Sequence, residues 1–159
     1  MTIRTAVEDD AETIAVLSGQ LGYPAHPSEV RDRLKKLRAR GDGEIFVAQA
    51  GRAVAGWVHV YGSHILETPA HAEIGGLVVD GRHRGRGIGK ELMAAAERWA
   101  ASAGYATVRV RSNVVREAAH EFYRRLGYSE TKRQAVFSKA VVIEKRREEG
   151  QDGHPRSTR

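Results

Sequence analysis

Three glycines at alternate positions form the segment that most constrains this chain, Arg84-Gly85-Arg86-Gly87-Ile88-Gly89-Lys90. The apolar stretch Ala72–Val79 precedes it and a helical pattern of apolar residues, Ile88–Trp99, follows, which predicts a strand, a turn and a long helix. Glycine permits backbone angles and close approaches that side chains prevent. The first amides of a helix lack internal partners. The segment therefore predicts a backbone site for a phosphate or pyrophosphate.

The charge of the chain agrees with an anionic partner. The 159 residues include 26 Lys and Arg against 20 Asp and Glu, a formal charge of +6. This excess alone does not choose among nucleic acid, a phosphate-bearing cofactor and an acidic substrate. Its clustering around the glycines favours a local anion site, formed by Arg82, His83, Arg84, Arg86 and Lys90. Because no nucleic-acid motif or aromatic platform is recognisable, we expect no nucleic-acid partner.

Two common phosphate-binding motifs do not fit the glycine-rich segment. The dinucleotide pattern G-x-G-x-x-G needs a third glycine where Lys90 stands. The P-loop pattern needs Ser or Thr where Glu91 stands. The pattern R-x-x-G-x-G does fit, with Arg84, Gly87 and Gly89. The alternative reading is a solvated surface turn with helix-capping glycines.

Hydrophobic periodicity divides the whole chain into short elements. Helices are predicted around residues 11–21, 29–40, 88–103 and 118–126, and the segment Gly62–Pro69 is expected to be a loop. The unit from Ala72 to Arg111 should be a right-handed crossover between parallel strands, with hairpins adding antiparallel neighbours. The expected strands are Thr2–Ala6, Glu44–Gln49, Ala53–Tyr61, Ala72–Val79, Thr107–Arg111, Tyr128–Lys132 and Gln134–Ile143.

Composition bounds the domain organisation. We expect one domain over residues 1–143 and a charged, disordered tail over residues 144–159, which lacks apolar periodicity. The absence of cysteine excludes disulfides, thiolate metal sites and cysteine nucleophiles. The histidines show no metal-ligand spacing, so no metal is expected. With no membrane-spanning run and no apolar signal segment after Met1, we expect a cytoplasmic protein without a membrane partner.

Two segments in this order resemble the GNAT superfamily of N-acetyltransferases, and the resemblance extends from Thr2 to about Lys139. The segment Val78–Leu92 is similar to the family's acetyl-CoA site, and Ala119–Tyr128 to its last helix-to-strand signature. The resemblance implies an α/β fold with a mixed, mostly antiparallel sheet of six to seven strands, about four helices and an opening between the central parallel strands. It also implies an acetyl-CoA-dependent enzyme that acetylates a primary amine by direct attack in a ternary complex.

The resemblance assigns the coenzyme to main-chain groups. The amides of residues 84–90 would hold its pyrophosphate, and the backbone of Leu77, Val78 and Val79 would pair with the pantetheine arm like an added strand. Asn113 is similar to a family asparagine that contacts the coenzyme. Gly75 and Gly76 interrupt an apolar strand, which favours a bulge there, and the alternative is two glycines packed under a helix. In the family such a bulge aims an amide, here near Leu77 or Val78, at the thioester carbonyl, where an oxyanion donor typically contributes about 3–4 kcal/mol.

Proton transfer needs side chains, because an amine must be neutral to attack and a departing thiolate must be stabilised. Glu73 has the spacing to Arg84 that some family members use for a general base, and a strand-edge ion pair is its alternative role. His71 is the second candidate base. Tyr123 lies in the family's F-Y-x-x-x-G-[FY] pattern and would be the general acid, with simple aromatic packing as its alternative.

The acceptor is left open between small-molecule and peptide amines. Its site is expected in the loops Leu21–Ser28 and Gly62–Ala70. Arg116 and His120 could meet the substrate or lie on a solvated helix face. A homodimer is expected by resemblance. The alternative function is a non-catalytic sensor module that binds acyl-CoA without turnover.

Overall fold

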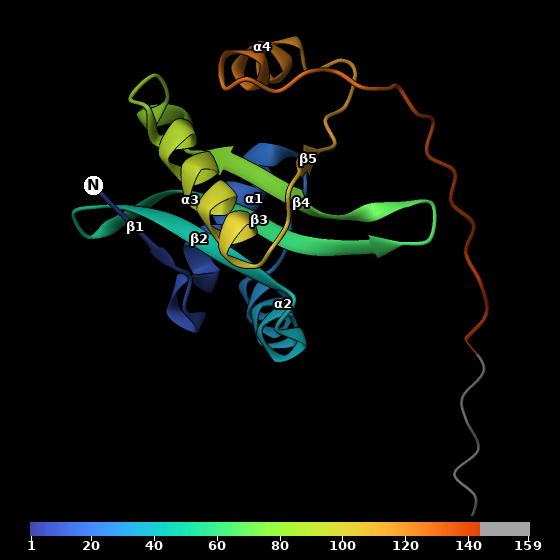
Figure 1. The fold of residues 1–159 in the computed structure, drawn as a ribbon. Coiled ribbons are helices and arrows are strands. Elements are labelled where there is room, and N and C mark those ends of the chain that lie inside the picture. Colours follow the sequence, from blue (N-terminus) through green and yellow to red (C-terminus); the bar gives the residue numbers. More distant parts are fainter. Residues whose placement is uncertain (144–159) are drawn as a thin grey trace, which may run out of the picture. The chain divides into compact units, whose positions relative to one another are not determined.

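A five-stranded sheet in the order β1-β2-β3-β4-β5 organises the fold, a computed structural model that describes residues 1–143 (Figure 1). The pairs β1–β2, β2–β3 and β3–β4 are antiparallel, whereas β4 and β5 are parallel. This confirms the expected α/β fold with a mixed, mostly antiparallel sheet. The strands are β1 (Thr2–Thr5), β2 (Gly43–Ala50), β3 (Ala53–Ile65), β4 (Thr68–Val79) and β5 (Val108–Val110).

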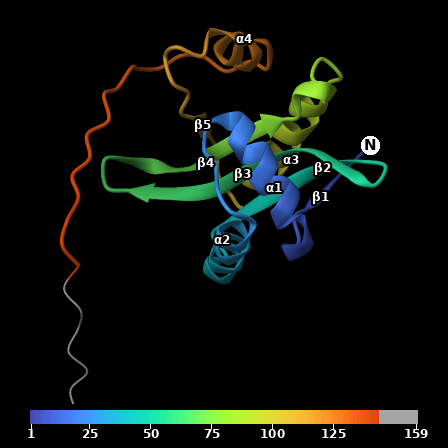
Figure 2. The same ribbon diagram turned by 180° about the vertical axis from the view of Figure 1, so that it is seen from behind.

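In the described part of the chain, four α-helices accompany the sheet, as the sequence predicts. α3 lies on one face, while α1 and α2 lie on the opposite face, as the two views from front and back show (Figure 1, Figure 2). Two short 3-10 turns, Glu8–Asp10 and Gly81–His83, precede α1 and α3. The helices are α1 (Ala11–Leu21), α2 (Pro27–Arg40), α3 (Ile88–Ser102) and α4 (Glu117–Arg125).

Strand periodicity explains why both faces of the sheet are covered. Successive side chains of a strand point to opposite faces, so Val58 and Val60 of β3 pack under Leu92 of α3. On the other face, Val47 of β2 packs against Val30 and other apolar residues of α1 and α2. The remaining residues of β3, between these core positions, therefore face the side of α1 and α2.

Residues 1–143 form a sheet of five strands, so the prediction of six to seven strands is wrong. Within residues 1–143, neither Tyr128–Lys132 nor Gln134–Ile143 is a strand. Val136 and Phe137 are 91% and 92% exposed. Alternating β-branched residues predict a strand only where a neighbouring strand pairs with them, because β-propensity reflects packing on a sheet.

Gly62–Pro69, predicted as a loop, is instead the end of a long hairpin. β3 extends to Ile65 and β4 begins at Thr68, which leaves a two-residue connection. Ser63 pairs with His71 and Ile65 with Thr68, so the two strands stay bonded almost to the tip. The hairpin projects beyond the helical layers in Figure 1. Of the two predicted acceptor loops, only the one between α1 and α2 is therefore a true loop.

Residues Met1–Ser129 form one compact unit, to which the described residues 130–143 do not belong. The predicted domain over residues 1–143 stays a prediction, and the predicted disordered tail, 144–159, lies outside the described residues. Among the helices of residues 1–143, none has the length and apolar character needed to cross a bilayer. The same residues contain no group of three or more His, Asp or Glu side chains placed to hold a metal ion.

Candidate active site

The glycine-rich segment forms an open turn at the N-terminus of α3. Gly85 and Gly87 have φ angles of +74° and +77°, a region that disfavours residues with a Cβ. Gly87 is the N-cap residue and no side chain caps the helix there. The first bond of the helix runs from the amide of Glu91 to the carbonyl of Gly87, so the amides of residues 88–90 are left without helical partners. These donors are available to a phosphate group.

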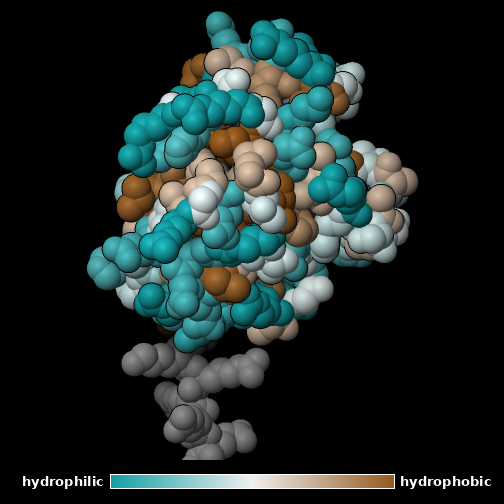
Figure 3. Space-filling view, turned by 90° about the vertical axis from the view of Figure 1, so that its left-hand side faces the viewer, coloured by the Kyte–Doolittle hydropathy of each residue, from teal (hydrophilic) through white to brown (hydrophobic). Residues whose placement is uncertain are grey.

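Basic side chains surround this turn, whereas the apolar side chain of Ile88 is buried. The side chain of Ile88 is only 4% exposed and anchors the first turn of α3 in the core. Arg84, Arg86 and Lys90 are exposed, and Arg84 reaches back to the carbonyl of Val79 at 3.4 Å. Hydrophilic side chains predominate on the face drawn in Figure 3. The turn thus offers amides, a helix dipole and positive charge together.

Asp80 fixes the approach from β4 to the turn. Its carboxylate accepts hydrogen bonds from the backbone amide of Arg82 at 3.0 Å and from the Arg82 guanidinium at 2.7 Å. The bond with the Arg82 side chain holds the pKa of this carboxyl well below its usual range. Gln20 of α1 accepts a hydrogen bond from the amide of Gly81 at 3.0 Å. The approach to the turn is therefore held by two side chains, that of Asp80 directly after β4 and that of Gln20 on α1.

A bulge interrupts β4 at Gly75, where the sequence predicts one. His59 pairs with Gly76 and Val60 with Ile74, so Gly75 is the extra residue. A Cβ at Gly75 would lie 2.7 Å from Nδ1 of His59, and one at Gly76 would lie 2.8 Å from the Trp57 ring. Both glycines are therefore required by close side chains of β3.

The parallel strands separate beyond the bulge. β5 pairs with β4 only at Ala72, Glu73 and Ile74. Within residues 1–143, the edge of β4 from Gly75 to Val79 has no strand on the β5 side. An unpaired strand edge offers a row of main-chain donors and acceptors. An extended ligand can therefore add along Leu77–Val79, next to the open turn.

Tyr123 lies on α4, which packs beside the start of α3. A Cβ at Gly89 would lie 3.1 Å from Cζ of Phe122, so α4 contacts the first turn of α3 at that point. Tyr123 is half-buried between the rings of Phe122 and Tyr128, with ring centroids 5.2 and 6.0 Å away. Burial raises the pKa of the Tyr123 hydroxyl, and the charge of Arg116 partly offsets this. A protonated phenol in this position can donate a proton.

Glu73 lies in a buried cluster rather than alone. Its Oε1 is 3.0 Å from Nε of Arg111, and its Oε2 is 3.5 Å from Nε2 of His71. His71 and Glu73 are 2% and 5% exposed. Nδ1 of His71 is 3.2 Å from the Pro69 carbonyl, which can only accept, so Nδ1 carries a proton. Within this cluster Nε2 of His71 faces the carboxylate of Glu73.

Three ring side chains of β3, which sequence reasoning missed, line the same face. Trp57, His59 and Tyr61 alternate along the strand, and Tyr61 pairs with Glu73 across the ladder. Burial and a hydrogen bond with Glu73 both raise the pKa of Tyr61. Burial lowers the pKa of His59, although the charge of Asp42 opposes it. Within residues 1–143, Trp57 Nε1 and His59 Nε2 are buried without a hydrogen-bond partner.

The other predicted site residues have local partners. Oδ1 of Asn113 accepts a hydrogen bond from the amide of Val115, which shapes the turn before α4. His120 contacts the carbonyl of Asn113 at 3.0 Å. Arg116 donates to the carbonyl of Leu21 at 2.6 Å and so links α4 to the α1–α2 loop. These contacts hold the turn before α4 and connect α4 to the C-terminal end of α1.

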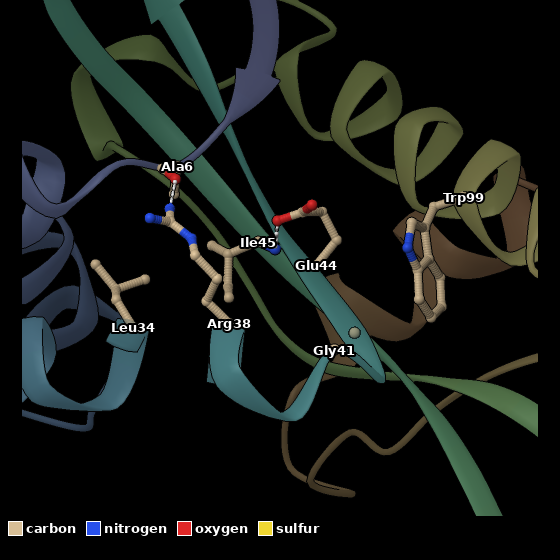
Figure 4. A pocket seen from close by; sticks show the side chains of 8 residues that line it. Ala6, Leu34, Arg38, Gly41, Glu44, Ile45 and Trp99 are labelled. Carbon is tan, nitrogen blue, oxygen red and sulfur yellow. Dashed lines mark hydrogen bonds between the residues drawn. The ribbon is translucent and has the colours of Figure 1, made fainter. Parts of the chain in front are cut away.

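A separate pocket of about 250 Å³ is lined mainly by residues of α2 and β2, and Trp99 is its one lining residue from α3 (Figure 4). Arg38 in its wall donates to the carbonyl of Ala6, and Glu44 accepts from the amide of Ile45. Trp99, which also lines the pocket, is 11 residues along α3 from Ile88, or roughly 16 Å at the rise of an α-helix. This pocket is therefore distinct from the glycine-rich turn.

Comparison with known proteins gives a consistent result. Residues 9–128 match the model of the acetyltransferase (GNAT) family. An aminoglycoside N(6′)-acetyltransferase type 1 from Stenotrophomonas maltophilia is 30% identical over 142 residues, which cover 86% of this chain and 91% of that protein. The chain is thus similar to a curated acetyltransferase over nearly its whole length.

Solved structures share the fold. The ligand-free aminoglycoside 6′-N-acetyltransferase from Acinetobacter haemolyticus superposes with a TM-score of 0.77 at 20% identity, over 89% of this chain and 100% of that one. An aminoglycoside 6′-acetyltransferase in complex with the bisubstrate analogue CoA-S-monomethyl-acetylneamine gives a TM-score of 0.76 at 21% identity, over 88% and 98% of the two chains. At these identities the likeness shows the fold.

Proposed function

The chain belongs to the GNAT family of acetyltransferases and is an N-acetyltransferase, and from that premise we propose that it moves the acetyl group of acetyl-CoA to a primary amine by direct attack within a ternary complex. The observation that carries the proposal is the open turn of residues 84–90 beside the free edge of β4. A structural relative that holds a CoA bisubstrate analogue supports simultaneous binding of both substrates.

The described residues fit the coenzyme. The amides of residues 84–90, with Arg84, Arg86 and Lys90 at the rim, would bind its pyrophosphate. The backbone of Leu77, Val78 and Val79 would pair with the pantetheine arm along the free edge of β4. Asn113 would contact the coenzyme from the turn before α4 through its amide nitrogen, since its Oδ1 is already bonded.

In this proposal Glu73 and Tyr123 move the protons. Glu73 accepts a proton from the attacking amine, with His71 3.5 Å away to share it. The new C–N bond forms as the C–S bond breaks, and Tyr123 donates its proton to the leaving sulfur. An amide near Leu77 or Val78, beside the bulge, stabilises the charge on the carbonyl oxygen. No covalent acyl-enzyme is required.

Turnover distinguishes this enzyme from a module that only binds acyl-CoA. The experiment is a titration of the protein with acetyl-CoA, followed by measurement of CoA release with a panel of primary amines. Release that depends on the amine supports the proposal. Tight acetyl-CoA binding with no release by any amine would instead establish the sensor module. No binding at the turn would overturn both functions.

Assembly and location are part of the same proposal. By family resemblance we expect a homodimer in the cytoplasm that uses no metal. Sedimentation measurements at several protein concentrations test the dimer, and activity in the presence of a chelator tests the independence from metal. The acceptor is an amine carried by a small molecule or a peptide.

A further inference from the structure

Proton donation in the proposed reaction leaves a negative charge on Tyr123. The C–S bond breaks, its electron pair goes to sulfur, and the sulfur takes the phenolic proton, so a phenolate remains until water returns a proton. Tyr123 is half-buried between the rings of Phe122 and Tyr128. Because burial disfavours the charged form of a side chain, this phenolate would be costly without a positive charge nearby.

Arg116 is placed to supply that charge. It is the N-cap residue of α4, and Tyr123 follows seven residues later, about two turns along the same face of the helix. Long side chains of a helix lean toward its N-terminus, which displaces the Tyr123 hydroxyl toward the Arg116 end of α4. The charge of Arg116 reaches this hydroxyl and opposes the effect of burial on its pKa.

A contact with α1 holds the guanidinium of Arg116 in place, although the residue is exposed. Nη2 donates a hydrogen bond of 2.6 Å to the carbonyl of Leu21, the last residue of α1. The final carbonyls of a helix lack internal partners and form the negative end of its dipole, which favours a cation there. A Cβ at Gly22, the C-cap residue of α1, would lie 3.6 Å from Nη2. The cation is therefore held between α1 and α4.

The same end of α1 is bonded to the approach to the glycine-rich turn. Oε1 of Gln20 accepts a hydrogen bond of 3.0 Å from the amide of Gly81. At the other side of the turn, Phe122 of α4 packs against Gly89 on α3. Two separate contacts therefore fix Arg116 and α4 relative to the turn that would bind the coenzyme.

The other polar groups around Tyr123 already have partners. The hydroxyl of Tyr128 donates a hydrogen bond of 2.8 Å to Oε1 of Glu97 on α3. His120, three residues before Tyr123 on α4, contacts the carbonyl of Asn113 at 3.0 Å. The stabilisation of a phenolate is therefore left to the cation at the start of α4.

We propose that Arg116 is a positioning residue for the acid step: its guanidinium, held on the carbonyl of Leu21, stabilises the phenolate that Tyr123 becomes when it protonates the leaving sulfur. The inference rests on the proposed function and concerns the same site. Because Arg116 acts through Tyr123, its effect falls on kcat and not on the binding of acetyl-CoA or of the amine.

Removal of the charge tests the proposal. We expect Arg116→Gln to lower kcat, measured as CoA release, by about tenfold, while the Kd for acetyl-CoA and the KM for the amine stay unchanged. Arg116→Met, which is also uncharged, should behave alike, whereas Arg116→Lys should recover most of the rate. The matched control is Arg125→Gln, because it removes an exposed arginine at the other end of α4, paired with Glu121 at 3.1 Å, and should leave kcat unchanged.

A double-mutant cycle with Tyr123→Phe tests whether Arg116 acts through the phenol. No phenolate forms in Tyr123→Phe, so adding Arg116→Gln there should change kcat by less than about twofold. A full tenfold loss in that background would overturn the inference and leave the acetyltransferase function intact.

Two further results would also overturn it. A folded Arg116→Lys enzyme as slow as Arg116→Gln would exclude a role for the charge. A Kd for acetyl-CoA that rises as much as kcat falls would make Arg116 a coenzyme ligand. The proposed function fails separately, if the wild-type protein binds acetyl-CoA but releases no CoA with any amine.

Discussion

The two ends of the candidate site are built from different parts of the polypeptide. The proposed coenzyme end consists of main-chain amides in one contiguous turn, residues 84–90, where two glycines adopt positive φ angles. The proposed acceptor end consists of side chains from β3, from β4 and from the residue after β5, including Tyr61, Glu73 and Arg111. The first is a local property of the chain, and the second exists only after the strands pair in register.

This difference explains why the proposed coenzyme end can keep the same ligand while the ligand of the acceptor end varies. Main-chain amides do not depend on side-chain identity, so a turn that keeps its glycines keeps its anion site. Side chains at the acceptor end can be exchanged one at a time without altering the backbone. A relative named as an aminoglycoside acetyltransferase therefore does not fix the acceptor of this chain.

The largest effect is expected for Gly87→Glu. A side chain at φ +77° strains the turn, and a carboxylate at the helix N-terminus repels a pyrophosphate. We expect the Kd for acetyl-CoA to rise by about a thousandfold, measured by calorimetric titration. The matched control is Gly104→Glu, where φ is +86° and a Cβ meets open space at the other end of α3. If both variants weaken binding equally, general strain and not the turn is responsible.

Tyr123→Phe should separate chemistry from coenzyme binding. Loss of the phenolic proton should lower kcat by about a thousandfold, within the usual range for a general acid, while the Kd for acetyl-CoA stays unchanged. Single-turnover rates provide the measurement. Tyr128→Phe is the control, because its hydroxyl is engaged 2.8 Å from Oε1 of Glu97 and should affect stability rather than rate. A Tyr123→Phe enzyme with normal kcat would reduce Tyr123 to a packing residue.

Glu73→Gln tests the acceptor end directly. The amide cannot accept the proton of the amine, so we expect kcat, measured as a single-turnover rate, to fall by about a hundredfold. The Kd for acetyl-CoA should not change, since Glu73 is not part of the turn of residues 84–90. A normal kcat would assign Glu73 to its alternative role, an ion pair with Arg111 that supports the strands.

The contrast between contiguous and assembled sites also describes what the sequence could predict. The strand, turn and helix around Gly87 could be predicted because apolar periodicity and glycine spacing are local. The bulge at Gly75 could be predicted for the same reason. The contact of Tyr61 with Glu73 could not, because it depends on which residue of β3 pairs with which residue of β4. The wrong prediction of a strand at Gln134–Ile143 has the same cause, because the sequence of a segment does not show whether another strand will pair with it.

Asp10→Asn should lower the stability of the fold without a specific effect on the coenzyme end or the acceptor end of the site. The carboxylate of Asp10 accepts hydrogen bonds from Arg4 at 2.7 and 2.8 Å and from the amide of Val7 at 2.8 Å. Breaking this mostly buried pair should cost about 2 kcal/mol of unfolding free energy, measured by urea denaturation. The Arg4 bond lowers the pKa of Asp10, so its stabilisation is present above the ordinary carboxyl range and is lost as pH falls. Asp42→Asn, in an exposed pair, is the control and should change stability little.

The smallest effect is expected for His59→Gln, which should change how the unfolding free energy depends on pH. Burial lowers its pKa below the ordinary value of 6.5, so His59 binds a proton more weakly in the folded protein than in the unfolded chain. The contribution of His59 is therefore fully present above pH 6.5 and is lost as pH falls, with a slope of no more than about 1.4 kcal/mol per pH unit. His59→Gln should reduce the change of the unfolding free energy between pH 7 and 5, measured by urea denaturation at each pH. An unchanged slope in His59→Gln would mean that water reaches the rings of β3, and the acceptor end would then be as solvated as the turn.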